Sequence, residues 1–224
     1  MAFVDVNDDG KPDLVAISAS GTLGKLIIYP NIGTPGNARF GDPVIHLVPG
    51  IFAAGRIIVA DMDNDGREDI VSSTTSSSGK VGIFKNTGSI TSLPFSVIFL
   101  SFSYMNDLAI GDINGDGKLE IIVAAEGVTS SGNTGIVVLA NHSIPGSLSF
   151  SAVNLAMSVA PSAVHLADLN QDFRPELIVA KKNLPEVVIH RNPGLATIDV
   201  GSFNMSAGSE VKPAIISWVL ALIY

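Results

Sequence analysis

A nine-residue acidic motif occurs four times in this chain of 224 residues, and its spacing constrains the fold more than any other feature. The copies begin at Asp5, Asp61, Asp112 and Asp168, so successive copies start 56, 51 and 56 residues apart. A period of this length indicates a repeat architecture, in which each unit is one small structure that packs on its neighbours. The motif divides the chain into repeats at about 1–55, 56–106, 107–162 and 163–224.

Short apolar runs surround each motif in the same order. In the second repeat, residues 56–60 precede the motif, Ile70 and Val71 follow it, and a later run ends at Asn86. Runs rich in Val and Ile and bounded by Gly, Asn and Pro favour strands joined by turns. Each repeat thus predicts three or four strands in about fifty residues, the size of one propeller blade. The expected fold class is all-β, a β-propeller with about four four-stranded blades present.

In every repeat the later apolar run ends in an asparagine, Asn31, Asn86, Asn141 or Asn192, and a phenylalanine follows it at a similar distance. Phe40, Phe95 and Phe150 lie nine residues after the asparagine, and Phe203 lies eleven residues after it. We expect these rings to fill the core between repeats.

Oxygen-bearing side chains stand at positions one, three, five and nine of every motif, where alternate side chains of a tight loop can converge on one point. Ca²⁺ takes six to eight oxygen ligands in flexible geometry. Position seven is always basic, so it would contribute its backbone carbonyl while its charged head points to solvent. The predicted ligands are Asp5, Asn7, Asp9, Lys11 and Asp13; Asp61, Asp63, Asp65, Arg67 and Asp69; Asp112, Asn114, Asp116, Lys118 and Glu120; and Asp168, Asn170, Asp172, Arg174 and Glu176.

Position six is glycine in three copies, Gly10, Gly66 and Gly117, which predicts a positive φ where the loop turns around an ion. The fourth copy has Phe173 there, and a bulky residue adopts a positive φ only at a cost. We therefore expect up to four calcium ions, with the fourth site the least favourable.

The charge distribution also favours metal. The four motifs hold fifteen of the 21 acidic residues and four of the 13 basic ones, while the rest of the chain is net positive. Carboxylates crowded into small loops repel one another unless a cation lies between them. An EF-hand is excluded, because position twelve, which must be glutamate, is Ala16, Ser72, Val123 or Val179.

The sequence resembles the FG-GAP or VCBS repeat family, whose calcium-loop blades build the propeller of integrin α subunits and of many bacterial surface proteins. The resemblance rests on the motif with its following strand and on the later Asn-x-Gly turns at Asn31, Asn86 and Asn192. The match is closer to the bacterial form, because clear FG and GAP tripeptides are missing.

The resemblance implies a ring of more blades than four, since the family propeller usually has seven. We expect a partial seven-bladed propeller in preference to a closed four-bladed ring. An open arc would leave unpaired strand edges that allow self-association.

The functional expectation is a non-catalytic module that binds an extracellular protein or glycan in adhesion, with calcium stiffening its loops. Two alternatives remain: an accessory propeller of a secreted carbohydrate- or lipid-active enzyme, since similar repeats occur in polysaccharide lyases and phospholipases, and a purely structural scaffold. Glu126 and Glu186 are the acids considered for sugar hydrolysis.

Several partners and compartments are disfavoured. Only Lys181 and Lys182 form an adjacent basic pair, so nucleic acid is not an expected partner, and no apolar run has the length of a membrane span. There are no cysteines for disulfides, and no secretion signal occurs in these residues. Sites with asparagine at position three should bind weakly and fill best at extracellular calcium, which predicts an extracellular or cell-surface location.

Overall fold

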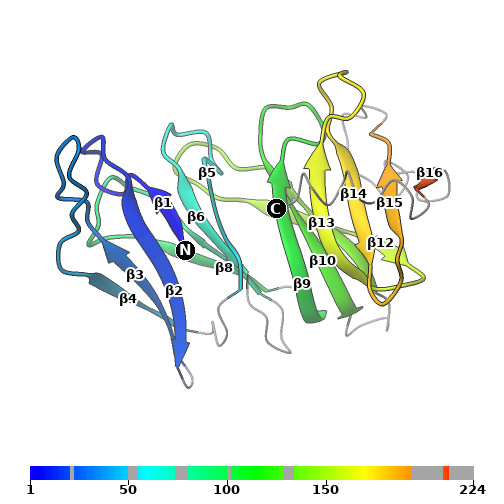
Figure 1. Cartoon of the computed structure of the whole chain (residues 1–224), viewed down its shortest axis with the longest axis horizontal. Coiled ribbons are helices and arrows are strands. Elements are labelled where there is room, and N and C mark those ends of the chain that lie inside the picture. The colour runs from blue at the N-terminus through cyan, green and yellow to red at the C-terminus, as the bar shows by residue number, and fades with distance from the viewer. Residues whose placement is uncertain are drawn as a thin grey trace. The chain divides into compact units, whose positions relative to one another are not determined.

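The computed structural model describes residues 1–20, 23–49, 55–73, 80–99, 102–128, 134–192 and 209–211 (Figure 1). Every regular element in these ranges is a β-strand, and the strands form four separate four-stranded sheets. No helix in the described ranges is long and apolar enough to cross a bilayer. The predicted all-β fold of four-stranded, blade-like sheets is confirmed, while the number of blades in a complete ring stays a prediction.

Each sheet takes four consecutive strands and arranges them as an antiparallel meander. Short connections between neighbouring strands give this order at little entropic cost. The first sheet contains β1 (Ala2–Val4), β2 (Asp13–Ser20), β3 (Leu23–Tyr29) and β4 (Val44–Pro49), and the second contains β5 (Ile57–Ala60), β6 (Asp69–Ser73), β7 (Lys80–Phe84) and β8 (Phe95–Phe99). The third contains β9 (Phe102–Gly111), β10 (Glu120–Val128), β11 (Thr134–Asn141) and β12 (Phe150–Met157), and the fourth contains β13 (Pro161–Ala167), β14 (Glu176–Lys181), β15 (Val187–His190) and β16 (Ser209–Val211).

The chain forms two compact units, Met1–Met105 with Ser143–Leu148, and Asn106–His142 with Ser149–Tyr224. The first unit therefore contains the first two sheets and, in addition, a hairpin loop from the third repeat. Its core contains Val15, Leu26 and Ile28 from the first sheet and Ile70 and Phe84 from the second, all at most 1% exposed. The second unit has its own core. It is made by Ala109, Ile113, Ile122, Ala124, Ile136, Val138, Leu155, Val164, Leu177 and Val179.

The inner strands of the first sheet are less deeply buried than those of the second and third. In β3, buried Leu26 and Ile28 alternate with half-buried Ile27 and Tyr29, as expected for a strand with one solvated face. In β6 and through most of β11, consecutive residues are buried, so both faces of these strands are covered. The apolar runs are continuous in both sheets, so the difference lies in burial, which alternates along β3 and is uniform along β6.

The phenylalanines do not all fill the core. Phe40 is 37% exposed and lies opposite Asn31 in an isolated β-bridge, so the expectation is wrong at this position. Phe150 is half-buried and pairs in the same way with Asn141. In these two repeats the nine-residue spacing closes a hairpin with the phenylalanine opposite the asparagine, whereas Phe95 of the second repeat pairs with Phe84. Phe203 lies outside the described residues.

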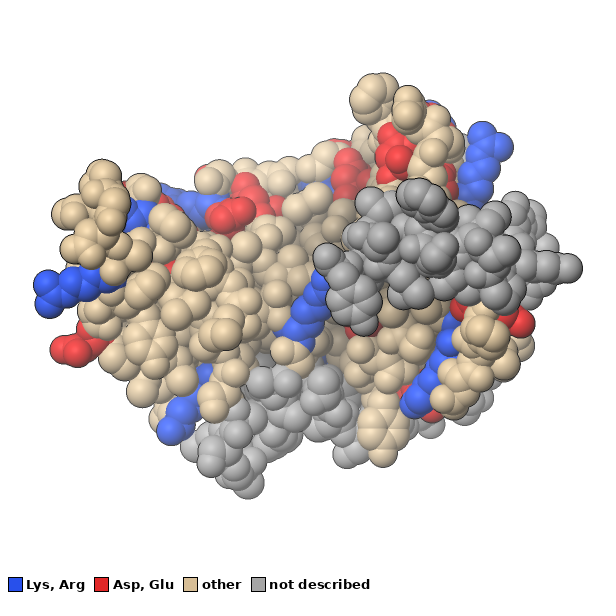
Figure 2. Space-filling model, in the orientation of Figure 1, with Lys and Arg blue, Asp and Glu red and all other residues tan. Residues whose placement is uncertain are grey.

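All four acidic motifs connect the first strand of a sheet to the second. The second strand begins at position nine of the motif, at Asp13, Asp69, Glu120 or Glu176. Figure 2 shows Asp and Glu side chains gathered at the ends of the sheets where these loops lie. The strand predicted to leave each motif is therefore present in every repeat.

Candidate metal centre

The carboxylate at position one holds the loop closed through backbone N–H groups further along the motif. Asp5 accepts hydrogen bonds from the N–H of Asp9 at 3.1 Å and of Gly10 at 2.7 Å. Asp61 accepts from Asp65 and Gly66 in the same way. The corresponding acceptors in the other loops are Asp112, for Gly115 and Gly117, and Asp168, for Asp172 and Phe173. These bonds tie position one to positions five and six in three loops, and to positions four and six in the third loop.

The aspartate at position five in turn accepts a hydrogen bond from the backbone N–H of position seven. Asp9 accepts the N–H of Lys11 at 2.9 Å, and Asp65 accepts that of Arg67 at 3.0 Å. The same bond joins Asp116 to Lys118 and Asp172 to Arg174. In three loops the amide oxygen at position three, from Asn7, Asn114 or Asn170, also accepts the N–H of position five. Side-chain oxygens thus accept the backbone N–H groups of a turn that is too tight for these groups to bond to backbone carbonyls.

The basic side chains at position seven have different surroundings. Lys11 is exposed, as expected, and lies 3.9 Å from Asp9. Arg67 instead donates its Nε–H to Asp8 of the first loop at 2.8 Å, with both side chains 40% or more exposed. A pair this exposed contributes little to stability. The guanidinium of Arg67 is thus exposed, as expected, and also pairs with the neighbouring loop.

Two residues of each loop have a positive φ. Gly10, Gly66 and Gly117 at position six have φ values of 77°, 90° and 82°, which confirms the prediction for these glycines. Phe173 follows the same path at 65°, with its ring 94% exposed. Position four also turns left-handed, at Asp8, Asn64, Gly115 and Gln171. Asp, Asn and Gly tolerate this region, so three of these four residues are of types that favour a left-handed turn.

The carboxylates at position nine are buried and serve the backbone. Asp69 is fully buried and accepts the N–H of Met62 at 3.0 Å and of Asn86 at 2.8 Å. Asp13 and Glu120 make the equivalent pair of bonds, to Val6 and Asn31 and to Ile113 and Asn141. Glu176 accepts from Leu169 and from the side chain of Asn170. In the first three repeats position nine therefore joins the loop to the end of the third strand.

Burial of these acids has an electrostatic consequence. Desolvation raises the pKa of Asp69 to about 6 and that of Glu120 to about 7, although the two N–H donors to each act in the opposite direction. Desolvation also raises the pKa of Asp13. Neighbouring carboxylates of the same loop raise all three further. A nearby cation would relieve this penalty.

The asparagine after the third strand connects loops as well as turning the chain. Its side chain donates to the carbonyl of position eight in every repeat, at Pro12, Glu68, Leu119 or Pro175. Asn86 also donates to the carbonyl of Asp5 at 2.9 Å, and Asn192 to that of Ile113 at 2.8 Å. Each of these two bonds ties a repeat to the preceding acidic loop, 81 and 79 residues away. The sequence predicted the turn and not this link.

The second loop contains a compact carboxylate cluster. One oxygen from each of Asp61, Asp63 and Asp65 lies within 4.8 Å of the others, a separation that suits a shared metal ion. Asp69, also a predicted ligand, is not part of this group and makes its backbone bonds instead. The other three loops have asparagine at position three, so an amide oxygen replaces the third carboxylate there.

Asp63 is the most enclosed member of the cluster. Its side chain is fully buried, and its Oδ1 atom has no hydrogen-bond partner. Its Oδ2 atom accepts the N–H of Gly146 at 2.8 Å and a bond from the ammonium of Lys85. Buried carboxylate oxygens are nearly always paired, so the free Oδ1 marks a place for a further ligand.

Lys85 was missed by sequence reasoning and lies at the centre of this cluster. Its Nζ atom contacts Asp63 and, at 2.7 Å, Asp65, and its side chain is 13% exposed. Desolvation opposes the charge of both partners, but their mutual bond lowers the pKa of Asp65 and raises that of Lys85. The only sequence signal was its place immediately before Asn86.

The two acids considered for catalysis lie in separate ion pairs. Glu126 accepts from Lys182 at 2.5 Å, which lowers the pKa of this carboxyl, and Glu186 accepts from Lys181 at 2.7 Å. A general acid in sugar hydrolysis needs a raised pKa, so Glu126 has the opposite environment.

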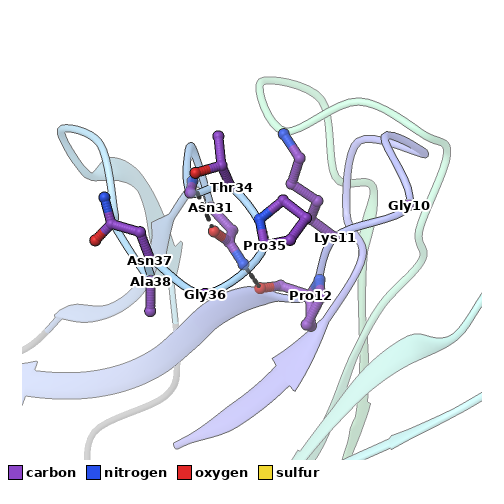
Figure 3. A pocket seen from close by; sticks show the side chains of 10 residues that line it. Gly10, Lys11, Pro12, Asn31, Thr34, Pro35, Gly36, Asn37 and Ala38 are labelled. Carbon is purple, nitrogen blue, oxygen red and sulfur yellow. Dashed lines mark hydrogen bonds between the residues drawn. The ribbon is translucent and has the colours of Figure 1, made fainter.

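A shallow pocket of about 550 Å³ lies beside the first loop. Its walls are residues 10–12 and the turn at residues 33–38, and Figure 3 shows the Asn31 amide directed to the carbonyl of Pro12. Lys11 is the charged residue of its lining. The pocket therefore borders the predicted metal loop without including its acids.

The repeated sheets and acidic loops define a β-propeller-like repeat protein. A family model for the FG-GAP-like repeat matches residues 5–72, 61–123 and 112–179, and each match runs from one acidic motif to the strand after the next. The chain belongs to the FG-GAP repeat family, which generally provides non-catalytic binding or structural modules. A search of curated proteins finds no significant match.

Proposed function

We propose that this chain is a calcium-binding β-propeller module that presents a binding surface for an extracellular protein or glycan and performs no catalysis itself. The observation that carries the proposal is the Asp61, Asp63 and Asp65 cluster, whose oxygens lie within 4.8 Å of one another. Membership of the FG-GAP repeat family supports it.

The donor chemistry of the loops fits calcium. Carboxylate, amide and carbonyl oxygens are hard ligands, and the described loops offer no thiolate or imidazole. The free buried Oδ1 of Asp63 is one oxygen that an ion would satisfy. Positions one, three and five would hold the ion, with the carbonyl of position seven and the carboxylate of position nine completing the set.

Calcium would supply charge neutralisation and stiffness. Each loop already has its turn fixed by hydrogen bonds, so an ion would add to a preformed structure instead of ordering a free chain. A stiff loop rim is a suitable support for a protein or glycan site. Weak sites with asparagine at position three fit an extracellular or cell-surface location.

The first experiment is a calcium titration by calorimetry on protein freed of divalent ions. The variants Asp5→Asn, Asp61→Asn, Asp112→Asn and Asp168→Asn each remove a carboxylate at position one, and each should remove or weaken one binding event. Asp42→Asn, an exposed aspartate outside the motifs, is the matched control and should change nothing. Absence of any binding heat up to millimolar calcium would overturn the metal proposal.

The second experiment addresses the partner. Glycan arrays and pull-downs from cell-surface extracts are compared in calcium and in EDTA. Calcium-dependent capture of a glycan or protein supports the binding module. A silent result in both assays favours the scaffold, and activity of an adjoining domain that depends on this chain favours the accessory role.

A further inference from the structure

Lys85 gives the second loop a feature that the first and third loops lack. The residue immediately before the asparagine is Pro30 in the first repeat and Ala140 in the third, so neither carries a charge at this position. In the second repeat the same place holds a lysine whose ammonium contacts two of the three clustered carboxylates. The fourth repeat has Arg191 there.

The contacts of Lys85 are made to the atoms that calcium would need. Its Nζ atom bonds Oδ2 of Asp63 and Oδ2 of Asp65, which stand at positions three and five of the loop. The ammonium is largely enclosed, since the side chains of Lys85, Asp63 and Asp65 are 13%, 0% and 15% exposed. Charges in such a place are poorly screened by water, so a second cation beside the same carboxylates is strongly repelled.

We propose that Lys85 is a built-in competitor of calcium at the second loop, a tethered cation that occupies the Asp63 and Asp65 carboxylates until calcium displaces it. The inference rests on the proposed calcium function and adds the order in which the loops fill with calcium. The second loop has the most carboxylates and yet fills after the first and third loops. Without calcium, the lysine keeps the loop neutralised and folded.

A neighbouring hairpin donates to the same carboxylate that Lys85 contacts. Gly146 donates its N–H to Oδ2 of Asp63, the atom that Lys85 contacts, so one carboxylate oxygen serves both donors. Oδ1 of the same side chain stays unpaired. Two donors share one oxygen while the other has none, so Oδ1 is the atom of this carboxylate that a cation could bind once the lysine withdraws.

The first test compares calcium binding in the wild type and in Lys85→Met. Removing the competitor should tighten binding at the second loop about tenfold, as follows if the lysine occupies the carboxylates about 90% of the time. The gained binding should disappear in the Lys85→Met/Asp61→Asn double variant. Lys25→Met is the matched control, because Lys25 lies on β3 and outside every motif, and it should leave the titration unchanged.

The second test uses the wild-type protein and needs no foldable variant. Lys85 should be acetylated slowly by acetic anhydride without calcium, because its side chain is only 13% exposed. Calcium should increase its acetylation rate, measured by peptide mass spectrometry, over the concentration range in which the second loop fills. Lys25 provides the internal reference.

The results separate the two proposals. If calcium binds in an Asp61-dependent way and neither Lys85→Met nor acetylation responds, the competitor role is overturned and the calcium function stands. If Lys85→Met gains an Asp61-dependent site and the wild type binds no calcium, the lysine is a permanent substitute for the ion, which overturns both its displacement by calcium and the calcium function of the natural chain. If neither protein binds calcium at the second loop, the competitor role is overturned, while heats sensitive to Asp5→Asn or Asp112→Asn decide the function independently.

Discussion

Replacing Phe173 by glycine should stabilise the protein. Phe173 has a φ of 65°, a conformation that costs a residue with a Cβ atom about 1–2 kcal/mol. Its ring is 94% exposed, so its removal sacrifices almost no packing. Glycine lowers the gain by about 0.4–1 kcal/mol because it is freer in the unfolded chain. The net expectation is a gain of about 1 kcal/mol.

The matched control is Phe173→Ala, which removes the ring and keeps the Cβ atom. If the reasoning holds, Phe173→Ala leaves the free energy of unfolding within about 0.5 kcal/mol of the wild type, while Phe173→Gly raises it. Urea denaturation in EDTA, followed by circular dichroism, measures both. Equal effects of the two variants would refute the strain argument, since they would assign the change to the ring. A loss of stability in Phe173→Gly would refute it as well.

Four further outcomes are expected. Gly66→Ala, where an added Cβ meets no atom within 4 Å at a φ of 90°, should lower the free energy of unfolding by about 1–2 kcal/mol in urea denaturation, entirely through backbone strain. Asp69 has a pKa of about 6 in the folded protein, above the value of an unfolded aspartate, so the stability that its protonated form contributes is present below about pH 4 and is lost as the pH rises through 6. The free energy of unfolding of the wild type, relative to that of Asp69→Asn in EDTA, should therefore fall by about 3 kcal/mol between pH 4 and 7.5. Asn86→Ala removes buried hydrogen bonds to two loops and should cost about 1–3 kcal/mol, more than Asn31→Ala, whose amide donates to its own loop. Lys182→Met breaks an ion pair with Glu126 that is more than a third exposed on the lysine side, and should change stability by less than about 1 kcal/mol in the same assay.

The sequence predicted the parts of the fold that depend on neighbours along the chain. The repeat period, the strand after each motif and the left-handed turn at Gly10, Gly66 and Gly117 all follow from local residue choice. The family match extends over the same repeats. No prediction covers position four, although Asp8, Asn64 and Gly115 are residue types that tolerate the positive φ found there.

The features that escaped prediction depend on contacts between distant residues. Asn86 bonds a carbonyl 81 residues away, and Lys85 reaches Asp63 from a strand end 22 residues later. No local pattern distinguishes such an asparagine from an ordinary turn residue, or such a lysine from a solvated one. Phe40 shows the converse, since a regular spacing indicated a core residue where the structure has a half-exposed hairpin partner.

The loop acids divide into two groups with different physical roles. Position nine is buried and bonded to backbone N–H groups in all four repeats, so it contributes to folding whether or not an ion is bound. Positions one and five are half-buried or exposed and hold a turn that water could also solvate. Removing an acid at position nine should therefore destabilise the calcium-free protein more than removing one at position one, which loosens the loop and should also weaken calcium binding. The repeated motif thus combines a carboxylate that supports the fold with the acids of the proposed calcium site, and Lys85 shows that two such acids can be neutralised from within the chain.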